Sequence, residues 1–315
     1  MVRKKDAMNR GENGKRTRLL VIGARGFLGT FVTSEASSLY EVVRGDRNRE
    51  DDETDQVIDV ADSASVRKAF AESRPDTVIL LAAISDIDRC QHEPELAVAV
   101  NLRGAENVAN ACAQSGARLL FTSTGAVFDG LKHGYSEEDQ VSPLSVYGET
   151  KAQAEAVVRA LVPQSVTLRV SLILGRTGKP GNNSLVDTMI RRWGNGEIVS
   201  ASVHESRNPI DAPMVGQWMV ELLSDDRNHG IFHAGATDSM TRYGLAKTIA
   251  DRLHIPSNLV QPDLHLKPGR APRGADHHLL TDKISKVCAT QPPSCQKVIE
   301  RSLNEVAEGS LRTGV

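Results

Sequence analysis

Tyr147 and Lys151 are the two residues whose types and spacing most directly suggest catalysis. They stand four positions apart in a segment, residues 147–161, whose pattern predicts a helix, so both side chains should lie on one helix face. A free tyrosine has a pKa of about 10 and is a poor acid at neutral pH. A neighbouring ammonium group stabilises the phenolate and lowers the pKa of the tyrosine, which can then exchange a proton with a substrate oxygen. On its own, such a pair is usually an ordinary surface combination.

Ser123 and Thr124 supply hydroxyl groups that could serve the same reaction. They follow a short apolar run, residues 119–121, that is typical of a buried strand. Open α/β sheets bind ligands at the carboxyl ends of their strands. A hydroxyl at this edge can hydrogen-bond the same substrate oxygen that Tyr147 would protonate. The sequence therefore predicts that a strand end and a helix face meet at one site.

A glycine-rich turn follows the first apolar run of the chain. Gly23, Gly26 and Gly29 stand at intervals of three, between the predicted strand 19–22 and a predicted helix, residues 27–39. Glycines at such a turn let the backbone bend sharply and approach a pyrophosphate. The following helix N-terminus offers free N–H groups to the phosphates. Because strand and helix flank the glycines, the turn predicts nucleotide binding.

Two features near this turn disagree about which nucleotide is bound. Asp46, at the end of the second predicted strand, would accept hydrogen bonds from the adenosine ribose and favour NAD. Arg47 and Arg49 follow at once, and an arginine there can hold the 2′-phosphate of NADP. Asp59 and Val60 could bond and pack against the adenine, although Asp59 fits a helix cap or loop equally well. The expected cofactor is NADP(H) or NAD(H).

Strands and helices alternate from residue 18 to about residue 170. Such alternation is typical of β-α-β units, which form a parallel sheet with helices on both faces. The predicted fold class is α/β, a doubly wound Rossmann-type sheet that binds NAD(P). The predicted strands are 19–22, 41–43, 57–58, 77–82, 119–121 and 166–170, and the predicted helices are 27–39, 63–73 with Asp62 as its cap, 94–115 and 147–161.

The alternation ends after Val170. Helical spacing returns at residues 185–193 and 210–223, and the apolar residues of the second of these segments share one face. We therefore predict that the chain rejoins the dinucleotide-binding domain, 18–170, at about 208–230. The segments predicted to form a smaller C-terminal α/β substrate-binding lobe are 171–207 and 231–315.

The composition excludes several classes of protein. The formal net charge is −2, whereas a dedicated nucleic-acid binder carries a strong basic excess, and no apolar run is long enough to cross a bilayer. We expect a soluble, cytoplasmic protein with no nucleic-acid or membrane partner. Residues 1–17 are basic and almost free of apolar side chains, so we expect a disordered tail that is not a signal peptide.

The cysteines and histidines follow no metal-binding pattern. The four cysteines form no C-x-x-C pair and no zinc-type cluster, which fits a reducing compartment. His277 and His278 are adjacent in sequence, and adjacent residues rarely reach one ion. We expect both histidines in a surface loop, and we predict no metal site.

Together, the glycine turn, the strand-end hydroxyls and the Tyr147/Lys151 pair resemble the extended short-chain dehydrogenase/reductase superfamily. Within it, the sequence is most similar to the dTDP-4-dehydrorhamnose reductase family. The similarity is dense up to residue 170 and sparse beyond it. The matching stretches are Leu81-Ala82-Ala83, Asp88, Glu93-Pro94-Glu95, Asn101, Ser123-Thr124, Val127-Phe128-Asp129-Gly130, Tyr135, Glu137, Asp139, Pro143-Leu144, Tyr147-Gly148-x-Thr150-Lys151 and Arg207-x-Pro209.

The resemblance implies an NAD(P)H-dependent reductase of a nucleotide-linked 4-keto-6-deoxy sugar, most simply dTDP-4-dehydrorhamnose to dTDP-L-rhamnose. Thr124 would polarise the keto oxygen, Tyr147 would donate the proton, and Lys151 would hold the nicotinamide ribose. With the residues argued above, the expected cofactor contacts are Gly23, Arg25, Gly26, Phe27, Leu28, Gly29, Asp46, Arg47, Asp59, Val60, Leu81, Ala82, Ala83, Tyr147 and Lys151. The expected substrate contacts are Ser85, Asn101, Ser123 and Arg207.

The sequence departs from the family pattern at Gly125 and Ala126, where the family usually has Asp-Tyr after Ser-Thr. This loss of a carboxylate and a phenol bears on the identity of the substrate rather than on hydride transfer. Two alternatives stay open: a nucleotide-sugar epimerase or dehydratase, and a non-catalytic regulatory subunit like that of methionine adenosyltransferase, which resembles the same family. Superfamily members often pair through helices, so a homodimer is compatible with the sequence.

Overall fold

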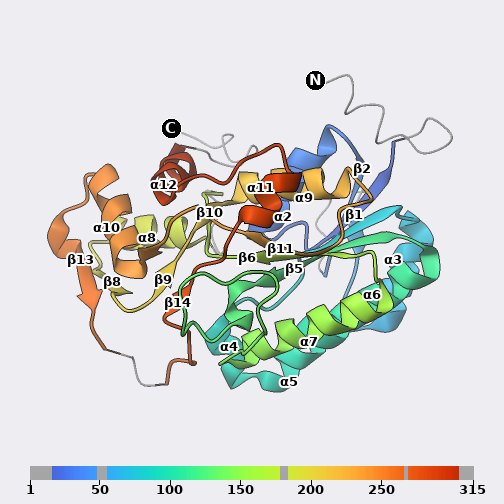
Figure 1. Ribbon diagram of the computed structural model, residues 1–315, viewed down its shortest axis with the longest axis horizontal. Helices are drawn as coiled ribbons and strands as arrows, with labels where there is room; N and C mark the ends of the chain where they lie inside the picture. The colour runs from blue at the N-terminus through green and yellow to red at the C-terminus, as the bar shows by residue number, and fades with distance from the viewer. Residues whose placement is uncertain (1–15, 48–54, 178–183, 266–268, 305–315) are drawn as a thin grey trace.

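The computed structural model describes residues 16–47, 55–177, 184–265 and 269–304. In Figure 1, a central sheet lies between two layers of helices, and a smaller group of strands and helices lies to its left. No helix within the described ranges combines the length and the apolar character that crossing a bilayer requires.

Seven parallel strands form the central sheet, in the order β11-β6-β5-β4-β1-β2-β3. Leu19 pairs with Thr77 on one side and with Val42 on the other. The runs Leu19–Ile22 and Val78–Leu80 are buried, as both faces of a parallel sheet must be when helices cover them. The predicted doubly wound parallel sheet is confirmed. Its strands are β1 (Arg18–Ile22), β2 (Glu41–Asp46), β3 (Asp55–Val57), β4 (Thr77–Leu80), β5 (Arg118–Thr124), β6 (Val166–Val170) and β11 (Gly230–Ala234).

Helices cover both faces of this sheet, and each layer has its own core. In Figure 1, α2 and α9 lie above the sheet, and α3, α6 and α7 lie below it. Asp62 caps α3 as predicted, since its side chain accepts a hydrogen bond from Ala64 N. Ser145 caps α7 in the same way through Gly148 N. The helices are α2 (Phe27–Ser37), α3 (Ser63–Ser73), α6 (Gly104–Ser115), α7 (Val146–Leu161) and α9 (Ala212–Leu223).

The predicted helix 94–115 is interrupted in the structure. It consists of α5 (Pro94–Ala97), a π-helical segment η1 (Val98–Arg103) and α6. Inside η1, the Asn101 amide bonds the backbone N–H and C=O of Ile84, at 2.8 and 3.1 Å. Apolar periodicity cannot reveal such a wider turn, which is a frequent feature near functional sites. A short helix, α4 (Ile87–His92), precedes this segment.

The second lobe consists of the elements to the left of the sheet in Figure 1. Strand β8 pairs with β13, and β9 lies between β12 and β14. The lobe contains α8 (Leu185–Gly194), β8 (Val199–Ser202), β9 (Ser206–Arg207), β12 (Met240–Thr241), α10 (Arg242–Arg252), η3 (Ser257–Leu259), β13 (Val260–Asp263) and β14 (Asp276–His277). The remaining elements are η2 (Gly125–Val127), β7 (Ile173–Leu174), β10 (Ile210–Asp211), α11 (Asp282–Val287) and α12 (Cys295–Asn304).

Two predicted boundaries differ from the structure. The segment that rejoins the dinucleotide-binding domain is predicted at about 208–230. It contains α9 and extends past residue 230 to β11, where Phe232 pairs with Leu168 of β6. At the other end, Glu41 N donates to Thr17 O over 3.0 Å, so the ordered backbone pairing already includes residue 17. Residues 1–15 of the predicted tail lie outside the described residues.

Candidate active site

The turn between β1 and α2 needs glycine for steric reasons. Gly23 has a φ of +89°, and a Cβ there would lie 2.7 Å from Ala82 N. A Cβ on Gly29 would lie 2.2 Å from Gly23 O. Gly26 is less crowded, since its nearest contact would be 3.3 Å. The turn and the first helix are therefore packed without room for side chains, as a close approach to a phosphate requires.

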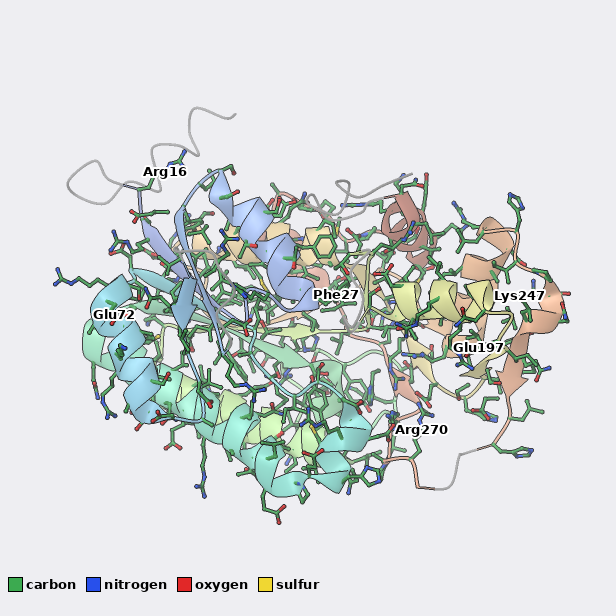
Figure 2. All side chains as sticks on the ribbon, turned by 180° about the vertical axis from the view of Figure 1, so that it is seen from behind. Arg16, Phe27, Glu72, Glu197, Lys247 and Arg270 are labelled. Atoms are coloured by element: carbon green, nitrogen blue, oxygen red, sulfur yellow. The ribbon has the colours of Figure 1, made fainter. Side chains whose placement is uncertain are left out.

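The amino end of α2 is open to a ligand. Its N-cap, Gly26, provides no side-chain hydrogen bond, whereas Asp62, Ser145 and Thr241 cap their helices with side-chain oxygens. Figure 2 shows Phe27 at this end of the helix, near the middle of the molecule. Uncapped N–H groups at a helix N-terminus bind anions. This end of α2 fits the pyrophosphate of a dinucleotide.

Asp46 lies directly beside this turn. Its carboxylate accepts hydrogen bonds from Arg25 N at 3.2 Å and from Arg47 N at 2.8 Å. The Arg47 side chain is exposed, and Arg49 lies outside the described residues. The Asp46 carboxylate thus lies beside the glycine turn and Arg47 follows it with an exposed side chain, so the two opposing signals of the sequence both remain.

Asp59 and Val60 serve structural contacts. Asp59 accepts from Ala61 N at 2.9 Å, and Val60 is buried against α6, where its C=O accepts from Asn107 Nδ2 at 2.9 Å. The Asp59 contact matches the loop alternative that the sequence left open for this residue, while Asp62 is the cap of the helix that follows.

A cleft of about 610 Å³ opens at the carboxyl edge of the sheet. Its wall combines the glycine turn, the ends of β4, β5 and β6, the start of α7 and residues of the second lobe. The expected site residues in this wall are Gly23, Gly26, Phe27, Leu28, Gly29, Leu81, Ala83, Ser85, Ser123, Thr124, Tyr147, Lys151 and Arg207. Those outside it are Arg25, Asp46, Arg47, Asp59, Val60, Ala82 and Asn101.

Thr124 and Tyr147 meet in this cleft. Thr124 Oγ1 accepts from Ala126 N at 3.1 Å, and the Thr124 hydroxyl is close enough to Tyr147 to lower the pKa of its phenol. Burial raises the pKa of Tyr147 to about 12, and Thr124 opposes this shift. The sequence predicted Lys151 as the group that lowers the tyrosine pKa, but the lowering partner is Thr124 and burial outweighs it. Tyr147 therefore carries its proton at neutral pH, as a proton donor must.

Lys151 lies one helical turn beyond Tyr147 and is buried. Its Nζ lies 4.0 Å from the centre of the Phe121 ring, and it has no hydrogen bond to another described residue. Burial lowers the pKa of Lys151 to about 7, while the negative charge of Glu155 acts in the opposite direction. An ammonium without a hydrogen-bond partner beside the cleft fits the hydroxyl groups of a bound ribose.

Two expected substrate contacts point elsewhere. Ser123 donates its hydroxyl hydrogen to the carboxylate of Glu155, away from Tyr147. Asn101 is buried and uses its amide on Ile84, in the loop that follows β4. By contrast, Ser85 is exposed in the wall of the cleft. Ser123 and Asn101 thus hold the backbone around the cleft.

Four arginines from the second lobe converge on the far wall of the cleft, and the sequence predicted only one of them. They are Arg207, Arg242, Arg270 and Arg273. Two carboxylates accompany them. Glu205 pairs with Arg270 and with Arg207, and Asp88 accepts from Arg273 at 2.8 and 2.9 Å. Counted with Glu205 and Asp88 alone, the four arginines carry two positive charges in excess, and Asp86 also lines the cleft.

Arg242 is the member of this group that is left without a partner. Its guanidinium makes no hydrogen bond to another described residue, although Arg242 stands at the first position of α10, where a positive charge opposes the helix dipole. Burial lowers its pKa, as it lowers that of Arg207 to about 10. A half-buried guanidinium in this position, with Glu205 as the nearby carboxylate, would be stabilised further by an anion that binds in the cleft.

The surface positions expected for His277 and His278 are wrong. Both side chains are buried, and His277 lines the cleft. A Cβ on Gly274 would lie 2.2 Å from His277 Nε2, so this glycine makes room for the imidazole. Burial lowers the pKa of His277 to about 3, so the ring is neutral at physiological pH.

The missed residues carried only a weak signal in the sequence. Arg270 and Arg273 belong to a polar stretch rich in glycine and proline, which by itself predicts a loop. Figure 2 shows Arg270 on the second lobe, next to the helices below the sheet. Within the described ranges, no group of three or more His, Cys, Asp or Glu residues has a geometry for a metal ion.

Known proteins resemble this chain over most of its length. A dTDP-4-dehydrorhamnose reductase from Aggregatibacter actinomycetemcomitans is 27% identical over 300 residues, which are 90% of this chain and 97% of the relative. Methionine adenosyltransferase 2 subunit beta from Xenopus tropicalis is 27% identical over 290 residues, 91% of this chain and 87% of the relative.

A solved structure agrees with this result. The dTDP-4-dehydrorhamnose reductase of Bacillus anthracis, in complex with NADP, superposes with a TM-score of 0.84 at 26% identity and covers 93% of this chain and 100% of its own. The family model described as the RmlD substrate binding domain matches residues 17–308. The chain therefore belongs to the RmlD substrate-binding domain family.

Proposed function

We propose that this protein is an NAD(P)H-dependent reductase of a nucleotide-linked 4-keto-6-deoxy sugar, most simply dTDP-4-dehydrorhamnose. The observation that carries the proposal is the convergence of Thr124, Tyr147 and Lys151 on one cleft that also contains the open end of α2. The Bacillus anthracis reductase with NADP supports both the reaction and the cofactor.

Cofactor binding, polarisation of the carbonyl group and proton transfer are each assigned to different residues of the chain. The glycine turn and the α2 N-terminus bind the pyrophosphate of the cofactor, and the Lys151 ammonium donates hydrogen bonds to the nicotinamide ribose. A reduced nicotinamide, when bound, supplies the hydride for the carbonyl carbon. Thr124 donates a hydrogen bond to the carbonyl oxygen, and Tyr147 transfers its phenolic proton to that oxygen as the alcohol forms.

The arginines of the second lobe bind the nucleotide part of the substrate. Their two excess positive charges match the two negative charges of a pyrophosphate diester, and guanidinium groups bind phosphate oxygens in pairs. Asp88 and Glu205 hold Arg273, Arg270 and Arg207 in place, which reduces the entropy that substrate binding must remove. Arg242 is the guanidinium with the most hydrogen-bonding capacity left for the substrate.

Arg242→Gln is expected to raise KM for the nucleotide sugar about 10- to 100-fold, because a charge-assisted contact to phosphate is lost. NADPH affinity should stay the same, since Arg242 lies on the opposite wall. Steady-state kinetics and NADPH fluorescence titration would measure the two effects. Arg252→Gln, at the exposed far end of α10, is the control. An unchanged KM in Arg242→Gln would contradict the assignment.

Asp46→Ala is expected to raise the ratio of kcat/KM for NADPH over that for NADH about tenfold, because a carboxylate repels the 2′-phosphate while Arg47 can still pair with it. Asp46→Ala/Arg47→Ala should lose this gain. Initial rates with both cofactors measure the ratio directly. A ratio unaltered in both variants would mean that neither side chain reaches the ribose.

The similarity to subunit beta of methionine adenosyltransferase 2 supports a second candidate, a regulatory subunit that binds NADP(H) without turnover. Loss of NADPH absorbance on addition of dTDP-4-dehydrorhamnose separates the two. Turnover favours the reductase. Stoichiometric NADPH binding without turnover of this or other 4-keto nucleotide sugars would favour the regulatory role, and a tightly retained cofactor that is recycled would favour an epimerase or dehydratase.

A further inference from the structure

A buried ion pair lies directly behind the Tyr147/Lys151 pair, and the reaction described above does not use it. Glu155 stands one turn beyond Lys151 on α7, and Arg169 faces it from β6. Arg169 Nε lies 2.9 Å from Glu155 Oε1, and Arg169 Nη2 lies 2.7 Å from Glu155 Oε2. Both side chains are buried. This two-point geometry is the strongest that arginine and a carboxylate can form.

The ion pair is connected to the strand that carries Thr124. Ser123, the neighbouring residue on β5, donates its hydroxyl hydrogen to Glu155 Oε1. On the other side, Arg169 lies 4.9 Å from the centre of the Phe128 ring, and its Nη1 is 3.4 Å from Nε2 of the buried His233. The carboxylate of Glu155 thus joins α7, β5 and β6 at one point.

A buried ion pair is by itself weak evidence of a stabilising role. Removing two charges from water is costly, and well-packed apolar residues can replace a buried ion pair with little loss or with a gain. The charges of Glu155 and Arg169 are therefore better explained by their effect on a neighbouring group. The nearest group of that kind is the Lys151 ammonium.

Glu155 acts on Lys151 from within the protein through its negative charge, and the Arg169 guanidinium bound to it carries the opposing charge. Cys90 of α4 is a further titratable group that acts on Lys151, and Tyr147 stands one turn before Lys151 on α7. Burial raises the pKa of both, so both are uncharged at neutral pH. On the β5 side, the Lys151 ammonium lies over the ring of Phe121. The ammonium form of Lys151 is accordingly stabilised by one carboxylate among the described residues.

We propose that Glu155, held by Arg169, is a positioning residue that keeps Lys151 protonated and, through Ser123, fixes the strand end that presents Thr124. This inference rests on the proposed reductase function for its catalytic consequence, but its electrostatic part concerns the protein alone. The direction of the effect is clear: without the Glu155 charge, the pKa of Lys151 falls further below its ordinary value.

The first test follows the Lys151 side chain itself. NMR of protein with lysine labelled with 13C at Cε, assigned through Lys151→Met, gives the pKa of Lys151 without cofactor or substrate. In Glu155→Gln we expect this pKa to fall by about one unit or more. Glu149→Gln, an exposed glutamate on the same helix, should leave it unchanged. An unaltered pKa in Glu155→Gln would overturn the proposal whether or not the protein is a reductase.

Glu155→Gln leaves the Arg169 cation buried without its partner, and the variant can fail to fold for that reason alone. The double variant Glu155→Gln/Arg169→Met removes both charges. We expect it to recover most of the thermal stability and to keep the lowered Lys151 pKa. If the double variant also recovers the wild-type Lys151 pKa, Glu155 has only a structural role and the proposal is wrong.

The catalytic part is tested by the pH profile of kcat with NADPH and dTDP-4-dehydrorhamnose. The rate should fall as pH rises through the Lys151 pKa, and this alkaline limb should move by about one unit to lower pH in the double variant. Ser123→Ala should lower kcat without moving the limb, because it loosens the strand end and leaves the charge. A limb that does not move would overturn the catalytic role, and wild-type protein without turnover would count against the reductase function instead.

Discussion

Tyr147→Phe is expected to lower kcat about 1,000-fold, because the hydroxyl that supplies the proton to the new alcohol is removed and water is a poor substitute in the cleft. NADPH affinity should hardly change, since Tyr147 contributes a hydroxyl beside Thr124 and the phosphates are bound by the glycine turn. The measurement is loss of NADPH absorbance with dTDP-4-dehydrorhamnose, alongside a fluorescence titration of NADPH binding.

Tyr135→Phe is a suitable control for the loss of a tyrosine hydroxyl. Tyr135 is buried, and its hydroxyl donates to Asp129 Oδ1 at 2.5 Å in a loop near the sheet edge. That variant should lose some thermal stability and keep its kcat. Substantial turnover in Tyr147→Phe would mean that another group donates the proton, and the role given to Tyr147 would have to be abandoned.

Gly29→Ala is expected to impair both folding and cofactor binding. The new methyl group would lie 2.2 Å from Gly23 O and 2.6 Å from the Ala24 backbone, where no flexible side chain can move aside. Overpacking of this kind costs about 3 kcal/mol. We expect a fall in Tm of about 6 °C or more and a loss of NADPH affinity of about tenfold or more, because the turn that binds the pyrophosphate must shift.

Gly194→Ala provides the matched comparison for this variant. Gly194 ends α8, and a Cβ there meets no atom within 4 Å, so alanine should be tolerated or slightly stabilising. Differential scanning calorimetry and NADPH titration of both variants give the comparison. A Gly29→Ala protein with wild-type Tm and affinity would show that α2 can move away from the turn.

The parts of the fold that rest on local chemistry were predictable from sequence. The run Leu19–Ile22 is apolar throughout because both faces of β1 are covered, and Asp62 begins α3 because its side chain satisfies a backbone N–H. The order of glycine turn, strand end and tyrosine helix placed Thr124, Tyr147 and Lys151 in one cleft because parallel strands bring their carboxyl ends to one edge.

The rest depends on contacts between distant segments. Arg242, Arg270 and Arg273 become one wall only when the second lobe folds, and nothing in their local sequence indicates it. His277 has the sequence context of a loop residue, yet it is buried, and the absence of a side chain on Gly274 leaves the space for its ring.

The direction of a short side chain is equally hidden from sequence. Ser123 follows a strand end as predicted, yet its hydroxyl is turned towards Glu155. A hydroxyl can bond whichever acceptor lies nearest, and the nearest acceptor is set by packing between α7 and β5.

The pairing of β11 with β6 also dictates when the sheet can be finished during synthesis. Strand β6 ends at Val170, but its outer partner β11 spans Gly230–Ala234, so the ribosome must make all of 171–229 first. During that interval β6 has one unpaired edge, and an exposed apolar edge strand is prone to pair with other chains. We therefore expect a stage of synthesis in which pairing with other chains competes with folding at β6, and this stage ends when β11 emerges, pairs with β6 and becomes the new edge strand.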